Sequence, residues 1–278
     1  MSTPLVSTAW LADHIEAPDI RVADASWYLP QAGRDAKAEY RTAHISRAVF
    51  FDIDDLSDDN DPRPHMLAPA AKFASRMRKL GLGDGNLIVV YDGAGIYSSP
   101  RAWWMLRVMG HSEVKVLEGG LPKWRSEGRA VEDMAAPSYP RHFTPRQNHA
   151  LIRDFNQMIA LQKSGAQIVD ARSSQRFAGR EEEPRPGVRR GHIPGSVNVH
   201  YAELTRDDGT LKPADELRAI FSARGIDLKK PIVTTCGSGI TAAIEMLALQ
   251  VAGASDVALY DGSWAEWGAR HEAPLAAD

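Results

Sequence analysis

Short runs of β-branched and other apolar residues recur along the chain and alternate with stretches of helical spacing. Glycine, proline or charged residues bound each run, as is typical of buried strands. The predicted strands are residues 20–24, 87–91, 114–117, 168–170, 231–235 and 257–260. Strands that alternate with helices pair in parallel, so the pattern predicts an α/β protein whose parallel sheets are flanked by helices.

Two of the predicted helices stop at a glycine. Residues 69–80 place apolar side chains at helical spacing before Gly81, and residues 242–251 do the same before Gly253. Glycine adopts the left-handed conformation that ends a helix at little cost, so these ends are well defined. A further helical run opens at Asp154.

The second half of the chain repeats the first at an offset of about 145 residues. The matching segments lie around His44 and His192, at 88–95 and 232–239, and before Trp124 and Trp267. Their order is kept, which predicts two domains of one plan. The predicted boundaries are 1–135 for the N-terminal domain, 136–150 for a proline-containing linker and 151–278 for the C-terminal domain.

Length and composition support a globular protein with two domains, each large enough to bury its own hydrophobic core. The 278 residues are 44% apolar and 25% charged, so folding by burial of apolar surface is expected. The net charge of −3 provides no basic field for nucleic acid or for an anionic membrane. A small molecule or another protein is therefore the expected partner.

Cysteine content and the N-terminal residues indicate the cytoplasm. A single cysteine forms no internal disulfide, which fits a reducing compartment. The first ten residues lack the basic start and apolar stretch of a signal peptide, and no segment approaches the roughly 18 apolar residues of a membrane span. We expect a cytoplasmic protein with no membrane partner.

Cys236 follows a predicted strand and precedes a predicted helix, with a glycine-rich turn between them. Reactive groups gather at the carboxyl ends of parallel strands, where a helix start presents unpaired N–H groups and partial positive charge. Gly237 and Gly239 allow the backbone to curl around the sulfur. Residues 237–241 should therefore cradle a nucleophilic thiolate, with N–H groups from Gly237, Ser238, Gly239, Ile240 and Thr241.

Other interpretations of this loop are weaker. A lone cysteine after an apolar strand is often an inert core residue, but a glycine-rich turn into a helix favours a reactive one. Residues 237–242 also satisfy a dinucleotide-binding pattern, which usually opens a domain and is absent from the first repeat. A cysteine phosphatase needs an arginine after the cysteine, and positions 237–246 hold no basic residue. Oxidation sensing by the thiol stays open.

The repeat and its motifs resemble the two-domain rhodanese superfamily over nearly the whole chain. The motifs that carry the resemblance lie at 48–54, 99–104, 191–195, 236–242 and 260–264. Asp92 stands in the first repeat where Cys236 stands in the second. Because a carboxylate cannot carry a persulfide, the resemblance implies a silent N-terminal domain and a catalytic C-terminal domain.

The resemblance implies a sulfurtransferase that works through a persulfide. The thiolate of Cys236 would take the sulfur of 3-mercaptopyruvate and release pyruvate. It would then pass that sulfur to a thiol acceptor, either a small thiol or a thioredoxin-like protein, or to cyanide in an assay. Neither a metal nor an organic cofactor is implied.

The residues directly after the cysteine bear on the sulfur donor. Family members that prefer thiosulfate usually carry Arg-Lys there, whereas this chain has Gly237 and Ser238. Losing two cations weakens binding of a small dianion more than binding of a monocarboxylate held elsewhere, which favours 3-mercaptopyruvate. A thiosulfate:cyanide sulfurtransferase is the nearest alternative, and a persulfide carrier or regulatory module is the alternative from another class.

A carboxylate-binding donor needs cations outside the cysteine loop. Residues 172–190 contain six arginines against three glutamates. The resemblance assigns Arg176 and Arg185 to the carboxylate and carbonyl oxygen of the substrate, and the guanidinium group suits a carboxylate bidentately. Arg180, Arg189 and Arg190 receive no role.

The resemblance also suggests a proton-relaying set of Ser238, His65 and Asp54. Histidine is suited to this task because it exchanges protons near neutral pH. The spacing of these residues does not reveal whether they meet. His192 has a counterpart in His44, which favours a structural role for both histidines.

Overall fold

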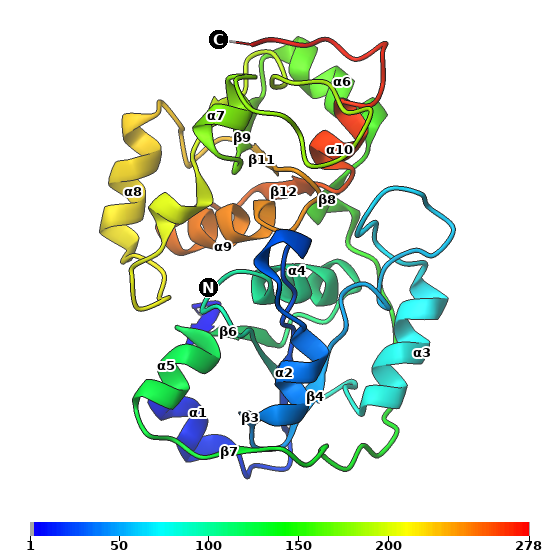
Figure 1. Ribbon diagram of the computed structural model, residues 1–278, viewed down its shortest axis with the longest axis vertical. Coiled ribbons are helices and arrows are strands. Elements are labelled where there is room, and N and C mark those ends of the chain that lie inside the picture. Colours follow the sequence, from blue (N-terminus) through cyan, green and yellow to red (C-terminus); the bar gives the residue numbers. More distant parts are fainter. Residues whose placement is uncertain (1–2, 278) are drawn as a thin grey trace. The chain divides into compact units, whose positions relative to one another are not determined.

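The computed structural model describes residues 3–277, which form two compact units. The first unit contains most of the chain up to Asn148, and the second contains most of the chain from His149 onward. The stretch predicted as a linker, 136–150, packs with the first unit up to Asn148. Each unit is an α/β domain built on a five-stranded parallel sheet, so the predicted fold class is confirmed (Figure 1).

The first unit has the strand order β1-β6-β5-β2-β4, and every neighbouring pair is parallel. Its strands are β1 (Leu5–Val6), β2 (Ile20–Asp24), β4 (Ala48–Phe50), β5 (Leu87–Tyr91) and β6 (Val114–Leu117). Its helices are α1 (Thr8–His14), α2 (Ala36–Thr42), α3 (Ala70–Leu80), α4 (Ser99–Val108) and α5 (Gly120–Ser126). A short antiparallel pair, β3 (His44–Ile45) and β7 (Val131–Glu132), completes it.

Both faces of the first sheet are buried. Val22 and Val89 lie opposite each other in β2 and β5 and join a core with residues of α1, α2 and α5. Helix α4 packs against β5 and β6, and Ile88 and Val90 are fully buried. Burial on both sides explains why these strands are continuous apolar runs in the sequence.

The second unit repeats this plan with the strand order β10-β9-β11-β12-β8, again parallel throughout. Its strands are β8 (Ile152–Arg153), β9 (Gln167–Asp170), β10 (Val197–Asn198), β11 (Ile232–Thr235) and β12 (Val257–Tyr260). Its helices are α6 (Phe155–Ser164), α7 (Ser174–Phe177), α8 (Ala214–Ala223), α9 (Ala242–Ala252) and α10 (Ser263–Trp267). Helix α9 packs along β11 and β12 and against α8 (Figure 1).

Helix ends follow the residues that predicted them. Helix α3 stops at Gly81, whose φ is +69°, and α9 stops at Gly253, whose φ is +109°. Helix α6 begins with a capping box, in which Asp154 accepts from the N–H of Gln157 and Gln157 accepts from the N–H of Asp154. These caps satisfy end groups that helical hydrogen bonds leave open.

His44 and His192 have matching structural environments. The Nδ1 atom of His44 lies 2.6 Å from the carbonyl oxygen of Tyr40 and its ring stacks on Tyr40; His192 has the same relation to Phe177, with a 2.9 Å contact. Both histidines are buried. Their predicted structural role agrees with these contacts.

Each repeat contributes one loop to the unit built by the other repeat. Asn60–Met66 belongs to the second unit, and Arg206–Leu211 belongs to the first. The two loops hold equivalent positions in the two sequence repeats, because His65 and Gly209 are separated by the same offset as Asp92 and Cys236. Gly209 packs on Gly95 so closely that a Cβ on Gly209 would lie 3.0 Å from the Cα of Gly95. Among residues 3–277, no helix is long and apolar enough to cross a membrane.

Candidate active site

Cys236 lies where β11 ends and the loop to α9 begins. The residue is 2% exposed, and the N–H of Gly239 donates a hydrogen bond of 3.1 Å to its Sγ. Gly239 has a φ of +82°, a left-handed conformation that glycine adopts without strain. Within the predicted cradle, Ile240 is buried and Thr241 is the N-cap of α9. The loop therefore directs a peptide N–H at the sulfur, the polar environment that an anion requires.

Helix α10 supports the cysteine loop from a second side. The N–H of Trp264 donates to the carbonyl oxygen of Cys236, and the N–H of Ala265 donates to that of Gly237, each at 2.9 Å. Ser263 connects the same segments, because its hydroxyl accepts from the N–H of Cys236 at 3.3 Å. The first N–H groups of a helix have no partner within the helix, so the loop carbonyls satisfy them and are themselves fixed.

Two predicted arginines lie at this loop. The Nη2 atom of Arg176, on α7, would be 2.9 Å from a Cβ added to Gly237, so the guanidinium group covers the glycine. Arg185 is half-buried. Burial lowers the pKa of Arg185, the thiolate of Cys236 raises it and the charge of Arg176 lowers it further. The structure thus brings the sulfur and both guanidinium groups into one electrostatic neighbourhood.

A chain of buried ion pairs, which sequence reasoning missed, holds Arg176. Asp170, at the end of β9, binds Arg172 with a closest contact of 2.7 Å. Arg172 binds Glu183 at 2.8 Å, and Glu183 binds Arg176 at 2.5 Å. The side chains of Asp170, Arg172 and Glu183 are each at most 4% exposed. Buried charges are costly unless they are paired, so this series of ion pairs fixes the direction of the Arg176 side chain.

Glu245 is a second feature that sequence reasoning missed. It lies in the first turn of α9, is fully buried, and neither carboxyl oxygen has a hydrogen-bond partner in the described part of the chain. Burial, followed by the charges of Asp170 and Cys236, raises the pKa of Glu245 well above its usual value. The raised pKa means that this carboxyl group favours its uncharged form beside the sulfur. The only sequence signal was an acidic residue inside an apolar helix.

We expect Glu245→Gln to reduce the loss of stability as pH rises. The raised pKa means that the folded state keeps a proton that the unfolded state releases. The stability that this proton provides is complete below about pH 4.5 and is lost as pH rises through the raised pKa. Urea unfolding between about pH 5 and about pH 8 should show the variant gaining up to about 1.4 kcal/mol per pH unit over the wild type.

The exposed Glu113→Gln variant is the matched control and should follow the wild type. If Glu245→Gln and the wild type lose stability in parallel with pH, the carboxyl group does not hold this proton.

Ser238 and His65 meet in the second unit. The Nδ1 atom of His65 lies 3.0 Å from the Oγ of Ser238, and both residues are buried. His65 has a φ of +61°, whereas its counterpart in the other loop is Gly209, with a φ of +77°. A side chain in this left-handed conformation costs about 1–2 kcal/mol, so the histidine occupies a strained position that a glycine would fill more easily.

Asp54, the third predicted member of the set, belongs to the first unit. Its Oδ2 accepts from the indole N–H of Trp27 at 3.1 Å, and its backbone N–H donates to Asp52 at 3.2 Å. The inclusion of Asp54 with His65 stays a prediction.

In the first repeat, the loop equivalent to the cysteine loop holds the carboxylate of Asp92 in place of a thiol. Oδ2 of Asp92 accepts from the N–H groups of Tyr97, Ser98 and Ser99 and from the Ser99 hydroxyl, at 2.7–3.0 Å. Oδ1 accepts from the N–H of Ala94 at 2.9 Å. Peptide N–H groups and the start of a helix thus stabilise the Asp92 carboxylate, and these contacts account for its position without a catalytic role. Asp92 is explained as a structural residue.

Comparisons with known proteins agree with the two-domain architecture. Residues 7–127 and 154–270 both match the family described as Rhodanese-like domain. The chain therefore belongs to the rhodanese family.

Relatives that match nearly the whole chain are sulfurtransferases. The chain is 45% identical over 276 residues to the 3-mercaptopyruvate sulfurtransferase of Escherichia coli (strain K12), covering 99% of this chain and 98% of that protein. It is 42% identical over 278 residues to the thiosulfate sulfurtransferase of Bos taurus, covering 97% and 93%. The crystal structure of SseA from Escherichia coli, described with the 3-mercaptopyruvate sulfotransferases, matches with a TM-score of 0.87 and 42% identity over 95% of this chain and 100% of that chain.

Proposed function

We propose that this protein transfers sulfur from 3-mercaptopyruvate to a thiol acceptor through a persulfide on Cys236 and releases pyruvate. The observation that carries the proposal is the Sγ of Cys236, which accepts from the N–H of Gly239 in a loop covered by the guanidinium group of Arg176. The charge of Cys236 also acts on Arg185. The match to proteins named 3-mercaptopyruvate sulfurtransferase supports it over 99% of the chain.

In the first half-reaction, the thiolate of Cys236 attacks the sulfur of 3-mercaptopyruvate. An S–S bond forms while the C–S bond breaks, and the electron pair of the broken bond passes to carbon as the enolate of pyruvate. The proton of the substrate thiol ends on this carbon, which gives pyruvate and leaves a persulfide anion on Cys236. A covalent intermediate lets donor and acceptor use the same site in turn.

Ser238 and His65 are suited to move the proton in this step. The 3.0 Å contact between the Oγ of Ser238 and the Nδ1 of His65 is a hydrogen-bond distance, along which a hydroxyl and an imidazole exchange a proton. Asp54 is the proposed third member, with the role of orienting the imidazole.

Arg176 and Arg185 are proposed to bind the carboxylate and the carbonyl oxygen of the donor. Arg176 is already ion-paired with Glu183, which orients its guanidinium group over the cysteine loop before substrate arrives. Preorganised cations bind developing negative charge without a further reorganisation cost. The enolate oxygen formed when the C–S bond breaks is such a charge.

In the second half-reaction, an acceptor thiol attacks the outer sulfur of the persulfide and restores the thiolate of Cys236. The acceptor is proposed to be a small thiol or a thioredoxin-like protein, and cyanide would replace it in an assay and leave as thiocyanate. A reducing compartment maintains such thiols, so we propose that the reaction takes place in the cytoplasm.

Thiosulfate:cyanide transfer is the second candidate, and the 42% identity to the bovine thiosulfate sulfurtransferase favours it. Against it, the position next to Cys236 is a glycine covered by Arg176, so the loop itself supplies no cation. A small dianion would have fewer charges to bind than in a loop that carries two of its own.

A comparison of donors tests the proposal. We expect kcat/KM with 3-mercaptopyruvate to exceed that with thiosulfate by about 100-fold or more, because two lost cations weaken the dianion by several kcal/mol. Both donors are measured with cyanide as the common acceptor. A preference for thiosulfate would reverse the assignment of the donor. Intact mass after incubation with 3-mercaptopyruvate alone should show one added sulfur atom, whereas a carrier that needs a partner would show none.

A further inference from the structure

The loop Asn60–Met66 carries His65 into the second unit and needs an anchor there. His65 lies 3.0 Å from Ser238 but has a left-handed φ of +61°, which a non-glycine residue rarely adopts. Such a conformation persists only where surrounding contacts impose it. The contacts made by the rest of the loop should therefore include one strong enough to hold it.

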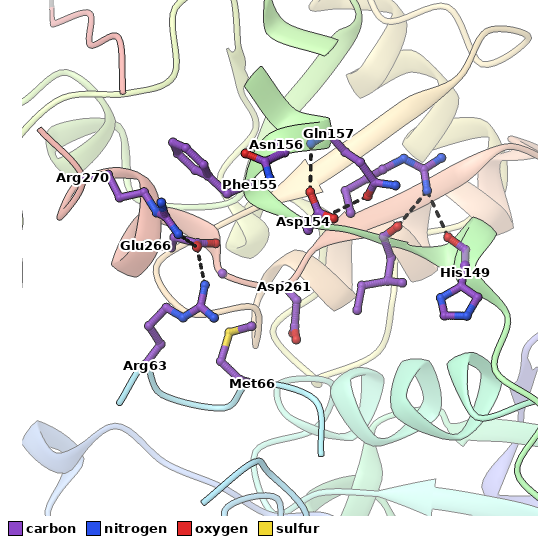
Figure 2. A pocket seen from close by; sticks show the side chains of 13 residues that line it. Arg63, Met66, His149, Asp154, Phe155, Asn156, Gln157, Asp261, Glu266 and Arg270 are labelled. Carbon is purple, nitrogen blue, oxygen red and sulfur yellow. Dashed lines mark hydrogen bonds and ion pairs between the residues drawn. The ribbon is translucent and has the colours of Figure 1, made fainter. Parts of the chain in front are cut away.

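Arg63 provides that contact. It forms an ion pair with Glu266, whose side chain is only 4% exposed (Figure 2). Within the loop, the Nε of Arg63 also donates to Asp61 at 2.8 Å, so the guanidinium group joins the loop's own turn to a buried carboxylate. A carboxylate removed from water and paired with arginine forms a stronger and more directional contact than an exposed pair.

Glu266 is itself fixed. Its Oε2 accepts from the buried hydroxyl of Tyr260 at 2.9 Å, and its Oε1 accepts from Arg270 at 3.0 Å. Burial and the charge of Glu266 raise the pKa of Tyr260, so this hydroxyl keeps its proton and remains a donor. Arg63 thus binds an acceptor that has little freedom to move.

The same helix holds the cysteine loop. Trp264 and Ala265, which donate to the carbonyl oxygens of Cys236 and Gly237, immediately precede Glu266 in α10. Helix α10 is therefore a common support, since its N–H groups hold the loop of the nucleophile and its glutamate holds the loop of His65. A shift of either loop relative to α10 would change the distance between His65 and Ser238.

A ligand site is a weaker explanation of these charges. Arg63, Glu266 and Arg270 line a cavity of about 460 Å³, together with the N-terminus of α6 (Figure 2). The two arginines share Glu266, and Asp154 is bound in the capping box of α6. These groups satisfy one another, so their arrangement is explained by support of the loop.

We propose that the Arg63–Glu266 ion pair is a positioning device that holds His65 against Ser238 for proton transfer in the sulfurtransferase reaction. This inference rests on the proposed function. It makes Arg63 a positioning residue, which acts through His65.

The test compares Arg63→Met with Arg270→Met, which removes the other arginine on Glu266 but leaves this carboxylate bound by the Tyr260 hydroxyl and by Arg63. We expect kcat with 3-mercaptopyruvate to fall by about 10- to 100-fold in Arg63→Met, with KM changed by less than about two-fold, because a proton-transfer group displaced by about an ångström loses most of its effect. In Arg63→Met, kcat should also depend less on pH between about pH 5 and about pH 8 than it does in the wild type. Arg63→Lys should recover part of the loss, and Arg270→Met should stay within about two-fold of the wild type.

Two further measurements separate the anchor from the reaction. In a His65→Ala background, adding Arg63→Met should cause no further loss, because both changes remove the same contribution. Hydrogen exchange of the amides in Asn60–Met66 should rise in Arg63→Met and stay unchanged in Arg270→Met, and this readout needs no activity.

Unchanged exchange in Arg63→Met would overturn the proposal, as would equal losses of kcat in the two variants. A wild-type protein that transfers no sulfur would instead overturn the proposed function, while the exchange measurement would still decide whether Arg63 anchors the loop.

Discussion

Cys236→Ser is expected to abolish sulfur transfer while leaving the fold intact. An S–S bond to the substrate sulfur cannot form at a serine oxygen, so no persulfide and no second half-reaction follow. Loss of a nucleophile typically lowers turnover by more than about 1,000-fold. Serine is similar in size, and its Oγ would accept from the N–H of Gly239 in place of the sulfur, so the free energy of unfolding should change by about 1 kcal/mol or less.

Initial rates with 3-mercaptopyruvate, intact mass and urea unfolding together check this result. Because the chain has a single cysteine, any sulfur added to the wild type but not to the variant is assigned to position 236 without peptide mapping. Substantial turnover by a folded Cys236→Ser protein would refute the persulfide mechanism.

Removal of the substrate-binding cations is expected to have the next largest effect. Arg176→Ala and Arg185→Ala should each lower kcat/KM for 3-mercaptopyruvate by about 10- to 100-fold, chiefly through KM, since a charge-assisted hydrogen bond contributes about 1.5–3 kcal/mol. Arg176→Ala should lower kcat/KM by more than the loss of its contact with the substrate alone would. The reason is that it also leaves the buried Glu183 with one partner fewer.

Steady-state kinetics with 3-mercaptopyruvate measure both variants, and Arg180→Ala is the matched control. Arg180 lies in the same arginine-rich stretch but is exposed, so its removal should leave KM unchanged. Iodoacetamide, which is uncharged and needs no carboxylate site, should still alkylate Cys236 in all three variants, more slowly in Arg176→Ala and Arg185→Ala because each loses a positive charge near the sulfur. Normal kinetics in both Arg176→Ala and Arg185→Ala would remove these residues from the site.

The central part of the fold was predictable because the buried strands carry their own signal. Strands β2, β5, β6 and β12 have the residue bounds that the apolar runs predicted, and α3 and α9 end at the predicted glycines. The edge strands β1 and β8 escaped prediction because each has two residues, too few to show a pattern. The order of the strands within each sheet was not predicted, because it depends on pairing between segments far apart in the chain.

The site divides in the same way. Cys236 and its glycines could be found from the sequence because the strand, the turn and the helix that form this part of the site follow one another directly along the chain. The ion-pair chain through Glu183 and the anchor at Arg63 could not be found, because both depend on which loops fold back on one another. Glu245 was visible as an acidic residue in an apolar helix, but only the structure shows that its carboxyl group lacks a partner.

Each repeat contributes a loop to the unit that the other repeat builds, and this exchange limits how the gene could be divided. Duplication normally frees one copy to diverge, and here the first repeat has Asp92 where the second has Cys236. Yet excising either half of the gene would take a loop away from the surviving half: Asn60–Met66, with its histidine, in one case and Arg206–Leu211 in the other. A catalytic role confined to the second unit would therefore still require the coding sequence of both repeats.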